Sequence, residues 1–303
     1  MKIVIVGAGA MGCLFGARLA SAGEAVTLVD VDEARLALLR ARGLTLVDDN
    51  GAHSRAIEAR LASEVEGAFD LVMLFTKGMH TASAVKSVSH LAGPETFALT
   101  LQNGIGNAEV IAEAFTPART LMGVTDFPAD LQDSVTVLSH GVGHVWIGAF
   151  DQAGTPSLAQ TVEAFNAAGL NAAASADVRV EIWEKLAFNV ALNTLATITE
   201  SPVGGLDSAA GRQIIATVVG EMTAVAQAKS IAISPASIHA KIANALAGHR
   251  NHKPSMLQDL LAGRTTEIET IAGTVVREGA KIGVETPVIA TLANLVRMKE
   301  GAK

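Results

Sequence analysis

Three glycines near the start of the chain constrain its fold more than any other feature. Gly7, Gly9 and Gly12 form a G-x-G-x-x-G pattern that directly follows the apolar run at residues 3–6 and opens a helix expected at residues 11–21. Such glycines permit a tight turn, let the backbone approach a pyrophosphate, and allow the helix to pack closely on the strand. The alternative is a βα turn that binds nothing, but the placement between strand and helix favours dinucleotide binding at the helix N-terminus. The residues expected to bind the cofactor from this turn are Gly7, Ala8, Gly9, Ala10, Met11 and Gly12.

Asp30 ends the second apolar run of the chain. An acidic side chain at this position accepts hydrogen bonds from the adenosine ribose hydroxyls and repels a 2′-phosphate. No Lys or Arg occupies residues 30–34, and the nearest base is Arg35. The alternative is that Asp30 or Asp32 only caps the next helix. The pattern therefore favours NAD over NADP.

Short apolar, β-branched runs alternate with helix-like stretches through the first half of the chain. The alternation predicts an α/β Rossmann domain with a doubly wound, mostly parallel sheet. In such a sheet the turns at the carboxyl ends of the strands form the ligand crevice, and two of these turns carry Lys77 and Asn103. The predicted strands lie at residues 2–6, 25–30, 71–76 and 96–101, with extensions of the same sheet at 119–124, 135–138 and 144–147, the later ones as antiparallel hairpins.

From about residue 180 the pattern changes to long helical periodicity with almost no strand signal. We therefore expect a dinucleotide-binding domain at residues 1–176 and an all-α substrate and catalytic domain at residues 177–303. The expected boundary lies in the Ala- and Asn-rich stretch 166–177. The predicted helices lie at residues 181–198, 211–228, 235–247, 254–261 and 267–283.

Three polar residues recur at helical spacing in the second half. Lys185, Asn189 and Asn193 follow at i, i+4 and i+8, which places them on one helix face among residues that should be buried. A narrow stripe of one Lys and two Asn is typical of a polar pocket wall, where a partly buried Lys acts as a general acid. The spacing alone is equally compatible with a solvated stripe.

Charge, hydropathy and cysteine content exclude several classes of protein. A net charge of −7 without a run of Lys and Arg argues against a nucleic-acid partner. Glycines interrupt the apolar start, and no later segment reaches the roughly 18 uninterrupted apolar residues of a membrane span, so we expect neither a secretion signal nor a membrane partner. A single cysteine, Cys13, is typical of a reducing compartment, and we predict a cytoplasmic protein.

Neither the single cysteine nor the histidines are predicted to carry the chemistry of this protein. Cys13 at a helix N-terminus is either a thiol of low pKa or a small packing residue, and the lack of a nearby base favours packing. His140, His144, His249 and His252 have no carboxylate or thiolate at ligand spacing, so no metal is expected. The chain contains no tyrosine, which excludes dehydrogenase chemistry based on a Tyr–Lys pair.

Taken together, several motifs resemble the ketopantoate reductase (2-dehydropantoate 2-reductase) family, from residue 1 to about residue 300. The specific parts are a Trp-x-Lys-Leu-Ala-x-Asn helix at residues 183–189 and the spacing of Ser-Met-Leu-Gln-Asp at 255–259 from Thr-Glu-Ile at 266–268. The resemblance implies an oxidoreductase that transfers a hydride from NAD(P)H to the ketone of ketopantoate, which gives pantoate for pantothenate biosynthesis. One departure is Asp30, because the family's usual member takes NADPH and has a basic residue near this position.

The resemblance also implies roles for individual residues. Lys185 would protonate the ketone oxygen, and Glu267 would help to position the substrate and the lysine. Lys77 and Asn103 would lie at the cofactor. The expected substrate contacts are Asn103, Asn189, Asn193 and Ser255.

The sequence is also compatible with two functions other than ketopantoate reduction, and with assembly into a homodimer. An NAD-dependent reductase of another branched or aromatic 2-keto acid is the first alternative. A cofactor-binding sensor without catalysis is the second, although the complete set of polar residues argues against it. The apolar helical domain makes a homodimer an expected assembly.

Overall fold

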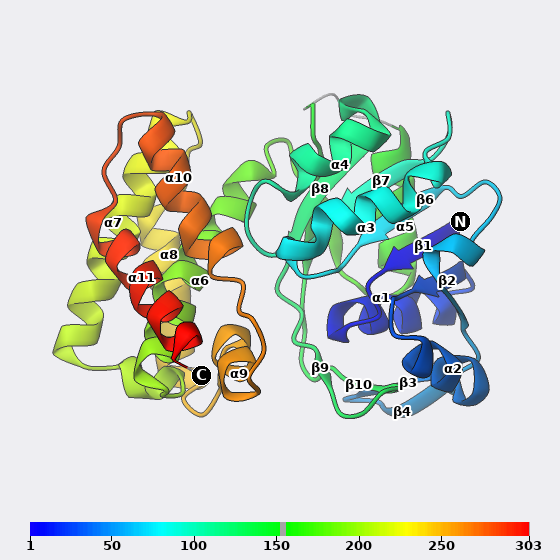
Figure 1. Ribbon diagram of the computed structural model, residues 1–303, viewed down its shortest axis with the longest axis horizontal. Helices are drawn as coiled ribbons and strands as arrows, with labels where there is room; N and C mark the ends of the chain where they lie inside the picture. Colours follow the sequence, from blue (N-terminus) through cyan, green and yellow to red (C-terminus); the bar gives the residue numbers. More distant parts are fainter. Residues whose placement is uncertain (152–155, 303) are drawn as a thin grey trace. The chain divides into compact units, whose positions relative to one another are not determined.

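The computed structural model describes residues 1–151 and 156–302 (Figure 1). The chain divides into two compact units, one formed by residues 1–102 and 107–178 and the other by residues 103–106 and 179–303. The stretch 166–177, expected to be a boundary, contains strand β12 (Ala172–Ala174), which pairs in parallel with β11 (Val145–Ala149). This stretch therefore belongs to the sheet of the first unit.

The first unit is built on an eight-stranded sheet in the order β12-β11-β8-β7-β6-β1-β2-β5. Neighbouring strands from β8 to β5 run parallel, and β11 is antiparallel to β8. This confirms the mostly parallel α/β sheet. Because β1 pairs with β2 on one side and β6 on the other, the strand order reverses beside β1, where such sheets bind ligands. The six parallel strands are β1 (Lys2–Val6), β2 (Ala25–Val29), β5 (Glu58–Arg60), β6 (Leu71–Leu74), β7 (Phe97–Thr100) and β8 (Thr120–Thr125).

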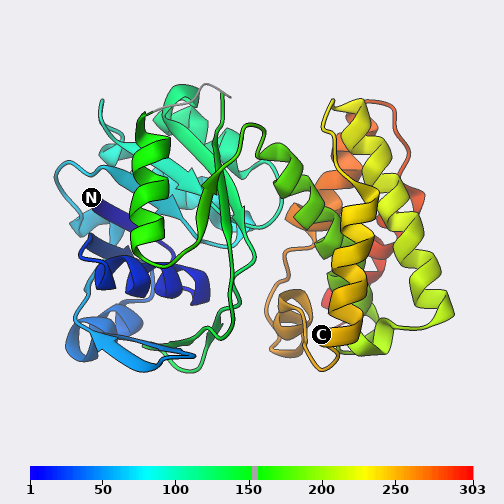
Figure 2. The same cartoon turned by 180° about the vertical axis from the view of Figure 1, so that it is seen from behind.

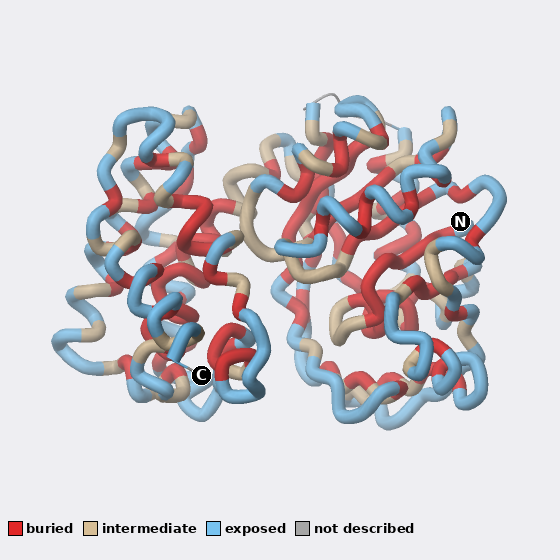
Figure 3. Tube along the Cα trace, viewed as in Figure 1, coloured by how far each residue is buried: buried red, intermediate tan, exposed pale blue. Residues whose placement is uncertain are grey.

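Helices cover both faces of this sheet, which explains why β1 is apolar at nearly every position. Ile3 and Ile5 point to one face and join the core formed with α1 and α5, whereas Val4 and Val6 point to the other and join the core formed with α3 and α4. All four residues are buried, and buried parts of the chain are red in Figure 3. The helices of this unit are α1 (Ala10–Ser21), α2 (Glu33–Arg42), α3 (Thr81–Val88), α4 (Asn107–Phe115) and α5 (Pro156–Ala167).

One predicted strand lies in a different sheet from the one expected. β10 (Thr136–Leu138) does not extend the main sheet but joins a four-stranded sheet in the order β4-β3-β10-β9. It pairs in parallel with β3, where Val137 is the partner of Leu46, and both side chains enter the core beneath α1. Alternation within three residues indicates a strand but cannot select its neighbour. The other strands are β3 (Leu44–Asp48), β4 (Gly51–Arg55) and β9 (Asp130–Leu131).

The second unit is helical around α6 (Arg179–Thr199), which packs against four other helices, α7, α8, α9 and α11 (Figure 2). None of the helices in the described ranges is long and apolar enough to cross a membrane. The remaining α-helices are α7 (Ala209–Ala228), α8 (Pro235–Gly248), α9 (Ser255–Leu261), α10 (Thr274–Lys281) and α11 (Pro287–Gly301).

Two features near the C-terminus differ from the prediction. The helix expected at residues 267–283 is a π-helical turn, η6 (Glu269–Gly273), followed by α10. Helix α11 was not predicted, although Pro287 at its first turn is a helix-start signal. The Glu221 carboxylate on α7 accepts hydrogen bonds from the backbone N–H groups of Val288 and Ile289 at 2.9 Å each, so a residue far along the chain closes this helix end.

Candidate functional site

The glycine turn lies between β1 and α1, and close packing accounts for two of its three glycines. Gly7 has φ +101° and donates its N–H to the carbonyl of Val29 at 2.7 Å. A Cβ on Gly12 would overlap the Gly7 carbonyl oxygen, so a side chain there would push the helix off the turn. Around Gly9 a Cβ would meet nothing within 4 Å. Gly7 and Gly12 are thus required by the fold itself, whereas Gly9 faces open space.

The residues of this turn fit a dinucleotide pyrophosphate. Gly9 is the N-cap of α1 and supplies no side chain to its first N–H groups, and the first turn of α1 contains no acidic residue. These N–H groups, with the positive end of the helix dipole, are suited to bind a phosphate. The open space beside Gly9 lets an anion approach the backbone.

Asp30 joins the end of β2 to the glycine turn. Its Oδ2 accepts a hydrogen bond from the Ala8 N–H at 2.7 Å, and its Oδ1 accepts from the N–H groups of Val31 and Asp32 at 2.8 and 3.1 Å. The cap of α2 is Asp32, which accepts from Arg35 N–H at 3.0 Å. Asp30 is therefore not the helix cap, and its carboxylate lies at the glycine turn with acceptor capacity left for a hydroxyl.

Cys13 and Arg35 form a partly buried contact next to this turn. The Cys13 thiol donates to the Ala8 carbonyl at 3.3 Å and accepts from Nη2 of Arg35 at 3.4 Å, while Nε of Arg35 donates to the carbonyl of Ser134 at 3.1 Å. Burial raises the pKa of Cys13 to about 11, and this outweighs the lowering by Arg35. A protonated thiol at neutral pH supports the packing role over a reactive one.

Lys77 lies three residues after the end of β6, and a hydrogen-bonded glutamine holds its turn. Nε2 of Gln102 donates to the Thr76 carbonyl at 2.6 Å and to Oγ1 of Thr81 at 2.9 Å, and its Oε1 accepts from Oγ1 of Thr100 at 2.9 Å. Gln102, which directly precedes Asn103, thereby joins the turn that carries Lys77 to the end of β7. No role was predicted for Gln102, and its place between a strand and Asn-Gly was the available signal.

In the second unit, α6 carries Lys185, Asn189 and Asn193 along one face. The two asparagines are buried, with 8% and 5% of their surface exposed, and Lys185 is half-buried. Such burial does not fit a solvated stripe. Ser255 is the first residue of α9, which packs against α6.

Glu184, next to Lys185 in the sequence, has a structural role on α6. Its carboxylate accepts hydrogen bonds from Ser234 N–H at 3.1 Å, Ser237 Oγ at 2.9 Å and Lys241 Nζ at 2.7 Å. Burial acts to raise the pKa of Glu184, but the hydrogen bonds from Lys241, Ser234 and Ser237 lower it overall. The interaction fixes α6 to α8.

Asn103 and Glu267 are brought into the same part of the second unit. Ile105, two residues after Asn103, packs against the core of this unit, and Gly104 lies against the backbone carbonyl of Thr270 in η6. The Glu267 carbonyl accepts hydrogen bonds from Thr270 N–H at 3.1 Å and Ile271 N–H at 3.0 Å. The segment of Asn103 therefore contacts the turn that begins beside Glu267.

The predicted site residues thus fall into two sets. The residues expected at the cofactor lie in the first unit, from Gly7 to Gly12 with Asp30 and Lys77, except for Asn103, which lies in the second unit with Lys185, Asn189, Asn193, Ser255 and Glu267. Within the described ranges no group of three or more His, Cys, Asp or Glu side chains is arranged to hold a metal ion.

Comparison with known proteins identifies a family over nearly the whole chain. The family described as ketopantoate reductase PanE/ApbA matches residues 3–152, and its C-terminal part matches residues 177–300. A 2-dehydropantoate 2-reductase from Halobacterium salinarum is 31% identical over 303 residues, which cover 99% of each chain.

Two solved structures resemble both units. The ternary structure of D-mandelate dehydrogenase with NADH and anilino(oxo)acetate has a TM-score of 0.94 and 31% identity, covering 100% of this chain and 99% of that one. A PanE/ApbA family ketopantoate reductase from Ralstonia eutropha JMP134 has a TM-score of 0.92 and 30% identity with the same coverage.

Proposed function

Because the chain belongs to the ketopantoate reductase family, we propose that it reduces the ketone of ketopantoate to the hydroxyl of pantoate with NADH. Membership makes it a nicotinamide-dependent oxidoreductase that acts on a small keto acid. The choice of ketopantoate and of NADH is the proposal.

The observation that carries this proposal is the buried polar face of α6. Reduction of a ketone requires a proton donor at the carbonyl oxygen, because negative charge develops there as the hydride arrives. Lys185 is half-buried on the same helix face as the buried Asn189 and Asn193, which would hold its ammonium group at the wall of a polar pocket as a proton donor. We assign the proton transfer to Lys185 on this ground.

Amide and hydroxyl groups suit the remaining polar atoms of the substrate. Asn103, Asn189, Asn193 and Ser255 offer N–H and O–H donors for a carboxylate and acceptors for the terminal hydroxyl of ketopantoate. Glu267 is a further acceptor for that hydroxyl, and it also has the charge to orient the Lys185 ammonium.

NADH, when bound, supplies the hydride that reaches the carbonyl carbon. The glycine turn would hold its pyrophosphate through the N–H groups of α1, and Asp30 would accept from the adenosine ribose. The Asp30 carboxylate also opposes a 2′-phosphate by like-charge repulsion. Support for NADH over NADPH therefore comes from the position of this carboxylate at the Ala8 N–H.

The experiment measures turnover of several 2-keto acids with NADH and NADPH in parallel. Ketopantoate should exceed its deoxy analogue, 2-keto-3,3-dimethylbutyrate, in kcat/KM, because a missing hydroxyl leaves buried polar groups unpaired at a cost of about 1–3 kcal/mol. Glu267→Gln should narrow the gap. Equal or faster turnover of the analogue by the unmodified protein would refute ketopantoate as the substrate, and a preserved gap in Glu267→Gln would move the hydroxyl contact to Asn189 and Asn193.

An aromatic 2-keto acid is the second candidate substrate. Its support is the resemblance to D-mandelate dehydrogenase, a structure that contains NADH, together with Asp30 at the glycine turn of this chain. Phenylglyoxylate belongs in the same panel, and a kcat/KM above that of ketopantoate would favour this candidate. Cofactor binding without oxidation by any keto acid would instead point to a sensor.

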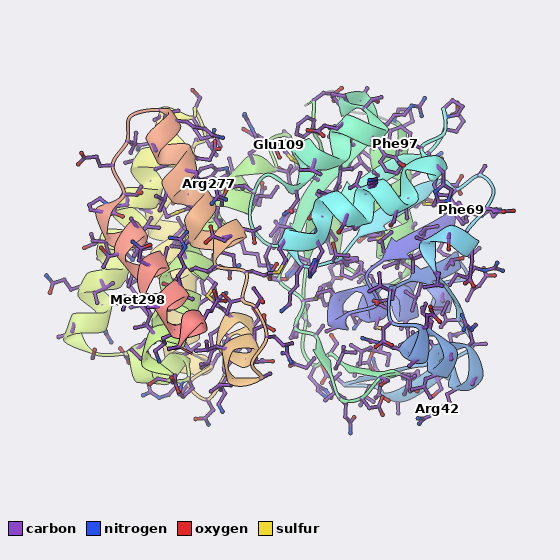
Figure 4. The ribbon with its side chains drawn as sticks, in the orientation of Figure 1. Arg42, Phe69, Phe97, Glu109, Arg277 and Met298 are labelled. Carbon is purple, nitrogen blue, oxygen red and sulfur yellow. The ribbon has the colours of Figure 1, made fainter. Side chains whose placement is uncertain are left out.

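We also propose a homodimer, with the helical unit as the source of the contact. Met298 on α11, labelled in Figure 4, is 69% exposed, and Leu295 is exposed on the same helix. Apolar side chains at i and i+3 form a strip suited to a protein contact. Light scattering gives the mass in solution, and a monomer at working concentration would exclude this assembly.

A further inference from the structure

The loop at residues 103–106 rests on a π-helical turn at one glycine. Gly104 has φ +87°, and a Cβ at this position would overlap the backbone carbonyl of Thr270 in η6. Gly106 in the same loop has φ +97°, but a Cβ there would meet nothing within 4 Å. Both positions need a left-handed backbone, yet only Gly104 is also in close contact with another segment.

The turn beneath Gly104 is held by side chains from two helices. Arg277 of α10, labelled in Figure 4, donates to Oε2 of Glu269 at 3.0 Å and to the Glu269 carbonyl at 2.9 Å. Arg297 of α11 donates to Oε1 and Oε2 of Glu269 at 2.6 and 3.0 Å. Hydrogen bonds from Arg297 and Arg277 lower the pKa of Glu269, so the cluster stays charged at neutral pH. These ion pairs therefore hold η6 in place, so that it can support the segments packed on it.

Glu267 lies at the start of this support. Its carbonyl accepts from Thr270 and Ile271 N–H groups, and Gly273 N–H donates to the Ile268 carbonyl at 2.8 Å, which is the wide hydrogen bond of a π turn. A displacement of η6 would thus move the backbone of Glu267 and, through the contact at Gly104, the residue next to it, Asn103.

Asn103 also has an anchor on its other side. Gln102 is fixed in the first unit by its hydrogen bonds to Thr76, Thr81 and Thr100. Only Asn103 separates this anchor from the contact of Gly104 with Thr270. The backbone of Asn103 is thereby restrained at both neighbours.

We infer that η6 is a common platform that sets the relative positions of Asn103 and Glu267 for substrate binding, with Gly104 and Glu269 as positioning residues. The inference rests on the proposed function, in which Asn103 and Glu267 contact the keto acid. Neither Gly104 nor Glu269 is assigned a contact with substrate or cofactor. Their effect should therefore appear in substrate recognition and not in binding of the adenosine half of the cofactor.

The first experiment compares Gly104→Ala with Gly106→Ala. Gly104→Ala should raise KM for the keto acid strongly, because misplacement of a binding group by about 1 Å costs up to about 10²-fold. Its affinity for ADP-ribose, measured by calorimetry, should stay within about twofold, since this ligand needs only the glycine turn and Asp30. Gly106→Ala bears the same backbone strain and should keep the KM of the unmodified protein. A general loss of folded protein would lower apparent kcat and leave KM unchanged, so the rise in KM separates positioning from instability.

A second pair of variants decides the matter if Gly104→Ala does not fold. Glu269→Gln removes the charge that holds Arg277 and Arg297, and we expect KM to rise about tenfold through a smaller displacement of η6. Asp207→Asn is the control, because Asp207 also binds an arginine, Arg212, through two contacts of 2.8 and 2.7 Å in the same unit. Unchanged KM in Glu269→Gln, or in a folded Gly104→Ala, would overturn the platform while leaving the proposed activity intact. Absence of keto-acid turnover by the unmodified protein would instead remove the proposed function and this inference with it.

Discussion

The glycine turn and the polar face of α6 offer different groups to a ligand, backbone N–H groups at the turn and side chains on the helix. At the turn, the proposed contacts are backbone N–H groups at the start of α1, and the missing side chains of Gly9 and Gly12 are what matter. In the helical unit, the proposed substrate contacts are side chains from α6, from α9, from the loop at residues 103–106 and from Glu267, which precedes the π turn. The difference teaches that an added methyl group should damage the first region, whereas loss of a functional group should damage the second.

The largest expected effect is the loss of the Lys185 ammonium. Lys185→Met keeps the length of the side chain but removes its proton donor, so kcat should fall about 10²–10⁴-fold. ADP-ribose affinity should be unchanged, because the glycine turn is intact. Lys299→Met, which removes a surface lysine paired with Glu200, is the control. Retention of more than about a third of the original kcat would exclude Lys185 from the chemistry.

The second prediction separates two roles within the glycine turn, the contribution of Gly12 to stability and that of Gly9 to NADH binding. Gly12→Ala should reduce the free energy of unfolding by about 1–3 kcal/mol, because its methyl group overlaps the Gly7 carbonyl and overpacking costs this much. Gly9→Ala should leave the unfolding midpoint near that of the unmodified protein and weaken NADH binding about tenfold or more, which is 1.4 kcal/mol. Urea unfolding and NADH fluorescence titration measure the two effects. Tight NADH binding by Gly9→Ala would mean that the pyrophosphate does not approach this residue.

The third prediction concerns Asp30, whose side chain is hydrogen-bonded to the backbone of the glycine turn. The unmodified protein should turn over faster with NADH than with NADPH, and Asp30→Ala should reduce this preference about tenfold, a modest value for one charge near a phosphate. NADH use should weaken as well, because the Ala8 N–H loses its acceptor. Steady-state kinetics with both cofactors measure the ratio. A tenfold preference of the unmodified protein for NADPH would contradict the assignment and direct attention to Arg35.

The smallest effect is expected at Glu184, a polar residue of α6 that we place outside the proposed substrate site. Glu184→Gln should lower stability by about 1 kcal/mol at pH 7 without changing kcat, because Glu184 binds Ser234, Ser237 and Lys241 of the fold. The folded pKa of Glu184 lies below its unfolded value, so its stabilisation is present above about pH 4.3 and lost as pH falls through the folded pKa. The difference between variant and unmodified protein in the free energy of unfolding by urea should therefore shrink as the pH falls below the unfolded value of about 4.3. A large fall in kcat at pH 7 would place Glu184 in the site.

The features predicted correctly from the sequence are those determined by residues close together in the chain. The strand, the glycines and α1 are consecutive, so their order alone specified the βα unit, and the buried parallel strands followed from their apolar runs. The stripe on α6 was visible because helical spacing is local. Pro287 at the first turn of α11 is a local signal of the same kind.

Contacts between distant residues could not be read in the same way. β10 joins β3 through Val137 and Leu46, and nothing within its three residues specifies that partner. The contact of Gly104 with Thr270 joins residues far apart in the chain, and a glycine after an asparagine is equally typical of an ordinary turn. The π turn arises because Gly273 N–H reaches the Ile268 carbonyl, a hydrogen bond that periodicity does not distinguish from the α-helical one.

The bare N-cap of α1 has a thermodynamic consequence. A Ser, Thr, Asp or Asn at an N-cap stabilises a helix by only about a few tenths of a kcal/mol more than Gly does, and Gly9 forgoes that small contribution. The protein alone is then slightly less stable than its fold permits, and bound dinucleotide more than offsets this deficit, since a ligand at 100 times its Kd adds about 2.7 kcal/mol to the free energy of unfolding. Thermal lifetime in the cell should accordingly follow the dinucleotide pool, so that starvation for cofactor shortens the life of the enzyme as well as slowing its turnover.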